Sequence, residues 1–194
     1  MAETHYITTY SGIHFDPVHP RPEDIRMDDI AHSLSLICRG NGEVKQFFSV
    51  GQHCIHCALE ALARGYSARI ALICLLHDAS EGYMSDVPRP FKQYIKDYRL
   101  WEDKLLSCIY EKFLGSDITE EEQKILKTLD NDLLAYDLHY LLNEPLREPL
   151  PKLFHAYSYE RERFEETEER YLRLYEQLKA QIQLKEKEVA KETG

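Results

Sequence analysis

Long apolar runs, positive charge and paired cysteines are all scarce in this sequence of 194 residues. No apolar run reaches the roughly 18 residues that span a bilayer, and Met1 is followed by polar residues, so we expect a cytoplasmic protein with no membrane partner. The 34 Asp and Glu residues outnumber the 24 Lys and Arg residues, which gives a formal charge of −10. Because nucleic-acid binders neutralise phosphates with a surplus of basic side chains, this charge argues against a nucleic-acid partner.

The cysteines are odd in number, and several lie in apolar stretches typical of buried helices. We therefore expect free thiols in a reducing compartment. Cys54 and Cys57 form a C-x-x-C pair, but the other cysteines lack the matching spacing of a zinc site. Core packing is the favoured interpretation of this pair, and a redox or metal-binding role is the minor alternative. The five cysteines are Cys38, Cys54, Cys57, Cys74 and Cys108.

The hydrophobic fraction of 43% is enough for one sizeable core, and the spacing of apolar residues is helical along most of the chain. We predict an all-α fold, a compact helical bundle with a charged amphipathic helix at its C-terminal end. The predicted division is an N-terminal arm at 1–24, a main helical domain at 25–157, and an amphipathic helix and tail at 158–194.

The predicted arm is rich in Pro, His and aromatic residues, which is typical of an extended segment with a short hairpin. The segment 67–79 is apolar all round and is predicted to be the central buried helix. The narrow apolar stripe of the last helix fits packing on its own domain or on a second subunit, and the sequence does not choose. The other helices are expected near 28–37, at 49–65, at 94–114, after Thr119 and at 159–192.

The residues that carry chemistry lie at the end of the predicted central helix, in the segment His77-Asp78-Ala79-Ser80-Glu81. Burying unpaired charges here would cost several kcal/mol, so these groups need a partner. A divalent cation is a suitable partner, because imidazole and carboxylate together bind manganese, iron, cobalt, nickel or zinc. Further ligands are expected in His53 and Asp130, although each alone also has an ordinary structural explanation.

The order His53, His77-Asp78 and a distant helical Asp resembles the H…HD…D signature of the HD superfamily of metal-dependent phosphohydrolases, which have an all-helical fold. Over about residues 25–142 the chain is similar to the branch that contains bacterial deoxynucleoside 5′-monophosphatases and phage deoxynucleoside triphosphohydrolases. The blocks that carry the resemblance are Asp29-Ile30-Ala31-His32, Cys38-Arg39, Phe48-Ser49-Val50-Gly51-Gln52-His53, Leu76-His77-Asp78-Ala79-Ser80-Glu81 and Asp86-Val87-Pro88-Arg89-Pro90-Phe91-Lys92.

The resemblance implies one divalent metal ion, which is Mn, Co, Zn, Fe or Ni, or Mg together with substrate. Its implied ligands are His53, His77, Asp78 and Asp130, and Asp132 is the rival for the last place. Glu81 matches the family's catalytic carboxylate, and its spacing after His77 and Asp78 predicts that it lies on their side of the helix.

The resemblance also implies residues that contact the substrate. Arg39 matches an arginine that contacts phosphate, and Asp86 matches an acid near the sugar. Lys92 and Lys127 are further candidates for substrate binding, with ordinary surface positions as the alternative. The sequence departs from the pattern at Gly40 and Glu43, which leaves the base open.

These features predict a metal-dependent phosphohydrolase that acts on deoxyribonucleotide 5′-phosphates and releases triphosphate or phosphate. One alternative is a cyclic-nucleotide phosphodiesterase, which would need extra ligands such as His32 or His56 facing the metal. The other is a non-catalytic, metal-stabilised regulator that uses the C-terminal helix to bind a partner. By resemblance we also expect a homo-oligomer.

Overall fold

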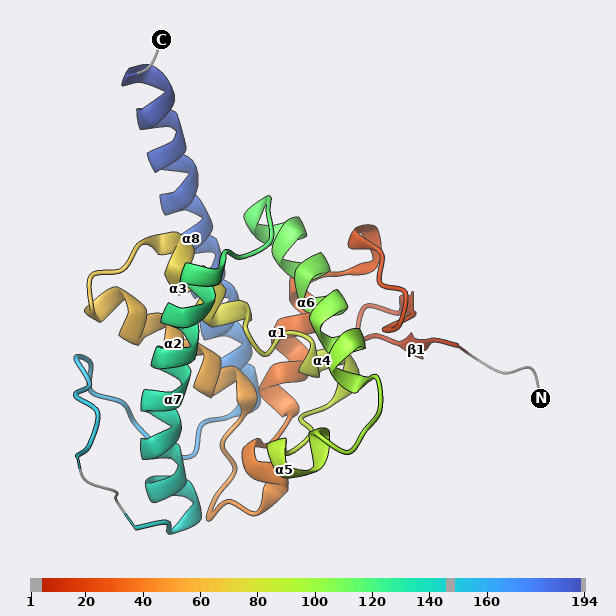
Figure 1. The fold of residues 1–194 in the computed structure, drawn as a ribbon, viewed down its shortest axis with the longest axis vertical. Coiled ribbons are helices and arrows are strands. Elements are labelled where there is room, and N and C mark those ends of the chain that lie inside the picture. Colours follow the sequence, from red (N-terminus) through yellow and green to blue (C-terminus); the bar gives the residue numbers. More distant parts are fainter. Residues whose placement is uncertain (1–4, 146–148, 193–194) are drawn as a thin grey trace.

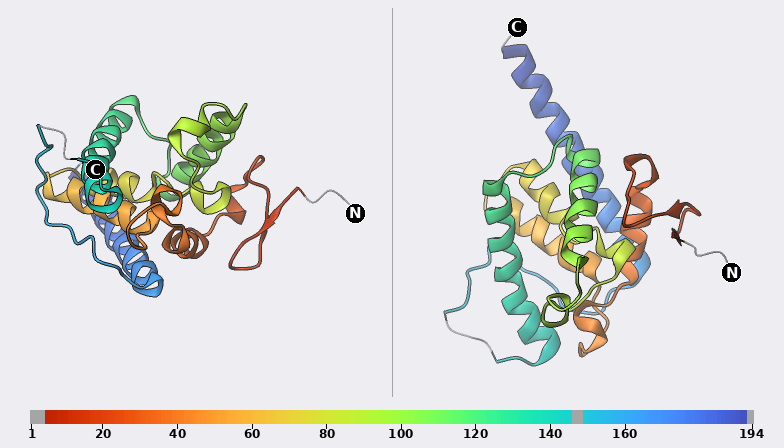
Figure 2. Two further views of the ribbon diagram at one scale, coloured as in Figure 1. Left: turned by 90° about the horizontal axis from the view of Figure 1, so that it is seen from below. Right: turned by 45° about the vertical axis from the view of Figure 1, so that its right-hand side comes forward.

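The computed structural model describes residues 5–145 and 149–192, so the first four residues of the predicted arm and the last two of the predicted tail lie outside the described residues. Within those ranges the fold is all-α, as predicted, with one small antiparallel sheet (Figure 1). This sheet pairs β1 (Ile7–Thr8) with β2 (His14–Phe15), with Ile7 opposite Phe15, and confirms the hairpin expected in the arm. Figure 2 shows the hairpin on the side of the molecule away from α7.

Six long helices form the body of the described part of the chain, and the sequence explains where two of them begin. The side chains of Ser49 and Thr119 each accept a hydrogen bond from the backbone N–H of the third residue of the following helix. The side chains of Gln52 and Glu122 in turn accept hydrogen bonds from the backbone N–H groups of Ser49 and Thr119, which completes two capping boxes. The long helices are α1 (Met27–Leu36), α2 (Val50–Ala63), α3 (Ala68–Leu76), α6 (Tyr98–Leu114), α7 (Glu120–Leu142) and α8 (Phe164–Glu192). The short ones are η1 (Pro22–Asp24), η2 (Arg39–Gly42), α4 (Glu81–Met84) and α5 (Arg89–Lys92).

Helix α3 is the central buried helix, as predicted, and it packs against α2, α6, α7 and α8. Helix α8 packs on its own chain, against α1, α2 and α3, which is one of the two arrangements that its stripe allows. Its Tyr171 is fully buried and donates a hydrogen bond to the carbonyl of Leu75 at 2.6 Å. The C-terminal end of α8 extends beyond the bundle (Figure 1). In the described ranges, no helix combines the length and apolarity needed to cross a membrane.

Three helix boundaries differ from the prediction, and one of them is the start of the last helix, which was expected at 159 and lies at Phe164. The helix expected over 67–79 ends at Leu76, and the chain continues in tighter turns, in which the N–H groups of Ala79, Glu81 and Gly82 each bond to the third carbonyl before them. Glu81 therefore begins the short helix α4 and does not continue α3, but it lies on the side of His77 and Asp78, as predicted, because all three line one cavity. Helix α6 begins at Tyr98, since Asp97 has a positive φ of 64° and cannot continue a helix.

Candidate metal centre

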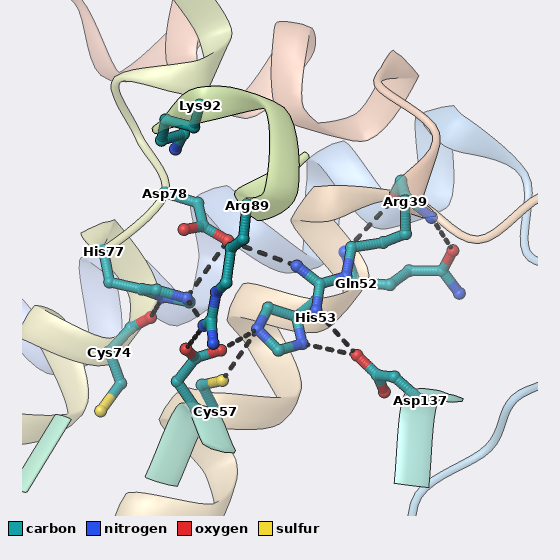
Figure 3. A network of polar contacts seen from close by, with 12 residues as sticks. Arg39, Gln52, His53, Cys57, Cys74, His77, Asp78, Arg89, Lys92 and Asp137 are labelled. Carbon is teal, nitrogen blue, oxygen red and sulfur yellow. Dashed lines mark hydrogen bonds and ion pairs between the residues drawn. The ribbon is translucent and has the colours of Figure 1, made fainter. Parts of the chain in front are cut away.

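Two helices, α2 and α7, and the turn after α3 bring the predicted metal ligands together, and Figure 3 shows His53, His77 and Asp78 of this set. His53 lies on α2, His77 and Asp78 follow α3, and Asp130 lies on α7. His53 Nε2 is 3.1 Å from Asp130 Oδ1, and His77 Nε2 is 3.8 Å from the same oxygen. His77 Nε2 is also 3.2 Å from Asp78 Oδ2. The donor atoms of His53, His77 and Asp130 thus converge on one place, and Asp78 lies beside His77.

Each histidine ring is oriented by an acceptor at its other nitrogen. Nδ1 of His53 lies 2.9 Å from Asp137 Oδ2, and Nδ1 of His77 lies 2.7 Å from the carbonyl of Cys74. In a neutral ring whose Nδ1 donates, Nε2 carries the lone pair, and here both lone pairs face Asp130. Two acceptors turned toward each other need a proton or a cation between them. An imidazole that donates Nδ1–H to a carboxylate or carbonyl is also typical of metal-bound histidine.

The cluster fits a divalent cation because it contains a buried polar atom that lacks a hydrogen-bond partner. His77 Nε2 is buried and forms no hydrogen bond, although Asp78 is close. A buried polar atom without a partner costs about 1–3 kcal/mol, which a bound cation would remove. One ligand atom each of His53, Cys57, His77 and Asp130 lies within 4.8 Å of the other three. This buried set of His, Cys and Asp side chains could hold a metal ion.

Asp132 does not share the position of Asp130. Its Oδ2 lies 2.9 Å from Arg64 Nη1, so its carboxylate is engaged in an ion pair away from the histidines. Of these two aspartates, Asp130 is therefore the one that the fold places at the cluster.

The positively charged guanidinium group of Arg39 lies beside the cluster. Arg39 Nη2 is 3.0 Å from Asp137 Oδ2, and Arg39 Nη1 is 3.6 Å from Asp78 Oδ2. Burial alone would lower the pKa of Arg39, but the carboxylates of Asp137 and Asp78 outweigh it and raise the pKa. Burial likewise opposes the ionised form of Asp130, yet the hydrogen bond to His53 and the charge of His77 lower its pKa. Both groups therefore stay charged.

A cavity of about 530 Å³ opens directly on the cluster. It contains the predicted catalytic residue Glu81 and three of the predicted substrate-binding residues. Burial raises the pKa of Glu81 well above its usual value, and the nearby carboxylates of Asp78 and Asp86 raise it further. The apolar wall of the cavity comes mainly from Val44, Leu134, Leu138, Leu141 and Leu142. The polar wall of the cavity includes Arg39, His77, Asp78, Glu81, Asp86, Arg89, Lys92 and Asp130.

The two predicted lysines lie in different surroundings. Lys92 lines the same cavity as Glu81, and its Nζ is 2.7 Å from Glu102 Oε1. Lys127 lines a second cavity of about 730 Å³ between α6 and α7. The two cavities have His77, Leu106 and Asp130 in common, so Lys127 approaches the cluster from the other side.

Two residues at the site were missed as functional candidates. Arg89, on the short helix α5, is exposed over 66% of its side chain, yet its Nη2 lies 2.8 Å from Asp130 Oδ2. Nothing in the sequence around an exposed arginine signals this contact. Asp137 lies two turns after Asp130, and this spacing puts both residues on the same side of α7. Its contacts with His53 and Arg39 depend on how α2 packs against α7, which the sequence does not show.

The histidines that a second metal would require lie elsewhere. His32 Nδ1 is 3.0 Å from Glu168 Oε2, and the ring of His56 packs against Phe48 and Tyr157. Burial lowers the pKa of His56 to about 3, which is the behaviour of a neutral core residue. Among the described residues, neither histidine belongs to a group that could bind a metal.

The departure from the family pattern at Gly40 has a structural reason. Gly40 has a φ of 59°, and a β-carbon there would lie 3.6 Å from Leu142. A side chain at this turn beside the cavity would adopt the left-handed conformation that glycine tolerates best.

Comparison with known proteins gives relatives without a described activity. No protein-family model matches the chain. The uncharacterized protein YfdR of Escherichia coli is 39% identical over 108 residues, which is 56% of this chain and 58% of that protein. An uncharacterized protein of Rhodobacter capsulatus is 36% identical over 109 residues, or 53% of this chain and 55% of that protein. The matches thus span little more than half the length of these relatives.

Proposed function

We propose that this protein is a metal-dependent phosphohydrolase of the HD type that acts on deoxyribonucleotide 5′-phosphates. The observation that carries the proposal is the convergence of two imidazole Nε2 atoms on Asp130 Oδ1, at a cavity that also contains Glu81 and the charged Arg39. Water would cleave the phosphate ester, giving a deoxynucleoside and either phosphate or triphosphate. Such a substrate supports the prediction of a cytoplasmic protein.

The cluster would hold the cation through His53, His77, Asp130 and Asp78. When bound, a divalent cation acts as a Lewis acid toward water and a phosphoryl oxygen. Glu81 lies in the same cavity and moves the proton. In its protonated form, which burial favours, it donates to the leaving 5′ oxygen, and in its ionised form it accepts from the attacking water.

The carboxylates of the cavity outnumber its basic side chains, so an anionic substrate would need the positive charge of the bound cation as well as these basic groups. Arg39, Arg89 and Lys92 line the cavity, and guanidinium groups bind phosphate oxygens with a favourable fork geometry. The volume of about 530 Å³ is within the roughly 300–1,000 Å³ of small-molecule sites. Asp86 lines the same cavity, where it can accept a hydrogen bond from a sugar hydroxyl.

The second cavity favours a triphosphate over a monophosphate. It meets the first at His77 and Asp130, so a substrate centred on the cluster has room on both sides of the bond that breaks. Lys127 lines this second cavity and is positioned for a longer phosphate chain.

The proposal is tested by incubating metal-loaded protein with each deoxynucleoside mono- and triphosphate and separating the products by chromatography. We expect deoxynucleoside to form with wild type and to be lost with Glu81→Gln. Glu121→Gln, on the exposed side of α7, is the matched control and should retain the activity. If no deoxynucleotide is consumed with any of manganese, cobalt, zinc or magnesium, the proposed substrate class is wrong. Release of phosphate or of triphosphate identifies the reaction.

A further inference from the structure

We propose that Cys57 is a further metal ligand, so that the centre binds its cation through a thiolate as well as through imidazoles and carboxylates. This inference rests on the proposed function, because it concerns the same metal centre. The resemblance to HD phosphohydrolases gives Cys57 no role, and the sequence favoured core packing for it.

The thiol of Cys57 faces the reactive side of His53. The two residues lie one turn apart on α2 and therefore share a face of the helix. Cys57 Sγ lies 3.5 Å from His53 Nε2, the nitrogen that faces Asp130. Cys57 is fully buried, so the thiol sits inside the cluster and not at its solvent edge. Figure 3 shows this sulfur beside the His53 ring.

The grouping of donor atoms also favours Cys57. Four donor atoms, from His53, Cys57, His77 and Asp130, lie within 4.8 Å of one another. Asp78 does not belong to this set, and falls with Cys54 and His77 in a second group of three. The unsatisfied Nε2 of His77 belongs to both groups. The thiol of Cys57 is therefore a further donor at the cluster, beside the Asp78 that the family resemblance implies.

A sulfur ligand changes which cation the centre prefers. Thiolate is a soft ligand that favours zinc, and with imidazole it also suits cobalt, whereas magnesium and calcium prefer oxygen. On binding, the S–H bond of Cys57 breaks, a bond from sulfur to the cation forms, and the proton passes to solvent. We therefore expect zinc or cobalt to bind more tightly than magnesium.

Absorption spectroscopy of the cobalt-loaded full-length protein tests the inference without any substrate. A thiolate bound to cobalt(II) gives an intense charge-transfer band in the near ultraviolet. We expect this band in wild type, its loss in Cys57→Ser and Cys57→Ala, and its retention in Cys108→Ser. Cys108 lies on α6, with its sulfur against the carbonyl of Pro20, and is the matched control. Circular dichroism checks that each variant is folded.

A wild-type protein that binds cobalt without the band overturns the thiolate ligand, and the hydrolysis assay then decides separately whether the proposed function stands. A band that survives in the Cys57 variants also overturns it, as does a failure of cobalt to bind. If both Cys57 variants fail to fold, Cys54→Ala and Cys74→Ala decide the matter. Retention of the band in both supports Cys57, and its loss in either one overturns the assignment.

Discussion

Replacing Asp137 by Asn should weaken metal binding, although Asp137 is not among the proposed ligands. Its Oδ2 lies 2.9 Å from His53 Nδ1 and 3.0 Å from Arg39 Nη2, so one oxygen holds both the ring and the arginine. An amide of the same shape removes the negative charge and is free to turn its NH₂ group toward the ring. Loss of a carboxylate that orients a metal-bound histidine typically lowers metal affinity by about 10–100-fold. That range corresponds to about 1.4–2.7 kcal/mol of binding free energy.

Calorimetric titration of metal-free protein with zinc measures this change. Asp132→Asn is the matched control, because Asp132 lies on the same helix but is paired with Arg64 away from the cluster. A partly exposed ion pair of that kind contributes about 0–1 kcal/mol to stability, so its loss should leave the zinc dissociation constant unchanged. An unchanged dissociation constant in Asp137→Asn, or an equal increase in both variants, would refute the reasoning.

Three further predictions concern Glu60, Arg89 and Gly40. Burial would raise the pKa of Glu60, but hydrogen bonds from Tyr157, Arg64 and the Phe154 N–H lower it. The ionised carboxylate of Glu60 therefore stabilises the fold above its unfolded pKa of about 4.3, and this stabilisation is lost as the pH falls through the folded pKa. Urea unfolding at pH 7 should therefore give Glu60→Gln a free energy of unfolding about 1–3 kcal/mol below that of wild type. This difference should become smaller in acid, and a difference that does not change with pH would contradict the reasoning. Arg89→Ala should raise the KM for a deoxynucleoside triphosphate while the fold is retained, and an unchanged KM would remove Arg89 from the substrate site. Gly40→Ala should cost about 1–2 kcal/mol in denaturant unfolding because of its positive φ, whereas Gly51→Ala should destabilise through crowding against Leu34 instead.

The sequence predicted those parts of the fold that depend on local patterns. The caps at Ser49 and Thr119, the apolar run that becomes α3 and the hairpin in the arm all follow from short stretches of residues. The end of α3 could not be predicted, because the tighter turns after His77 have the same sequence character as a continuing helix. Placing Glu81 in the cavity required the three-dimensional path of those turns.

Some residues of the candidate site could likewise be predicted from the sequence, and others could not. His53, His77 and Asp130 stood out because polar groups among apolar positions need a partner, and the fold brings them together. Arg89 and Cys57 did not stand out, since an exposed arginine and a cysteine in an apolar helix are ordinary in sequence. The contact of Arg89 with Asp130 depends on the packing of α5 against α7. Cys57 contacts His53 within α2, but the fold is needed to bring His77 and Asp130 to the same place. Only tertiary structure makes these residues candidates.

The most direct test of the central claim is the metal dependence of hydrolysis. Protein stripped by a chelator and then dialysed would be assayed for release of deoxynucleoside from deoxynucleoside triphosphates before and after one equivalent of divalent metal is restored. The account predicts no product without metal, recovery on reloading, and no recovery in His77→Asn, which removes the imidazole shared by both groups of donor atoms. Equal turnover with and without metal, or full recovery in His77→Asn, would contradict it.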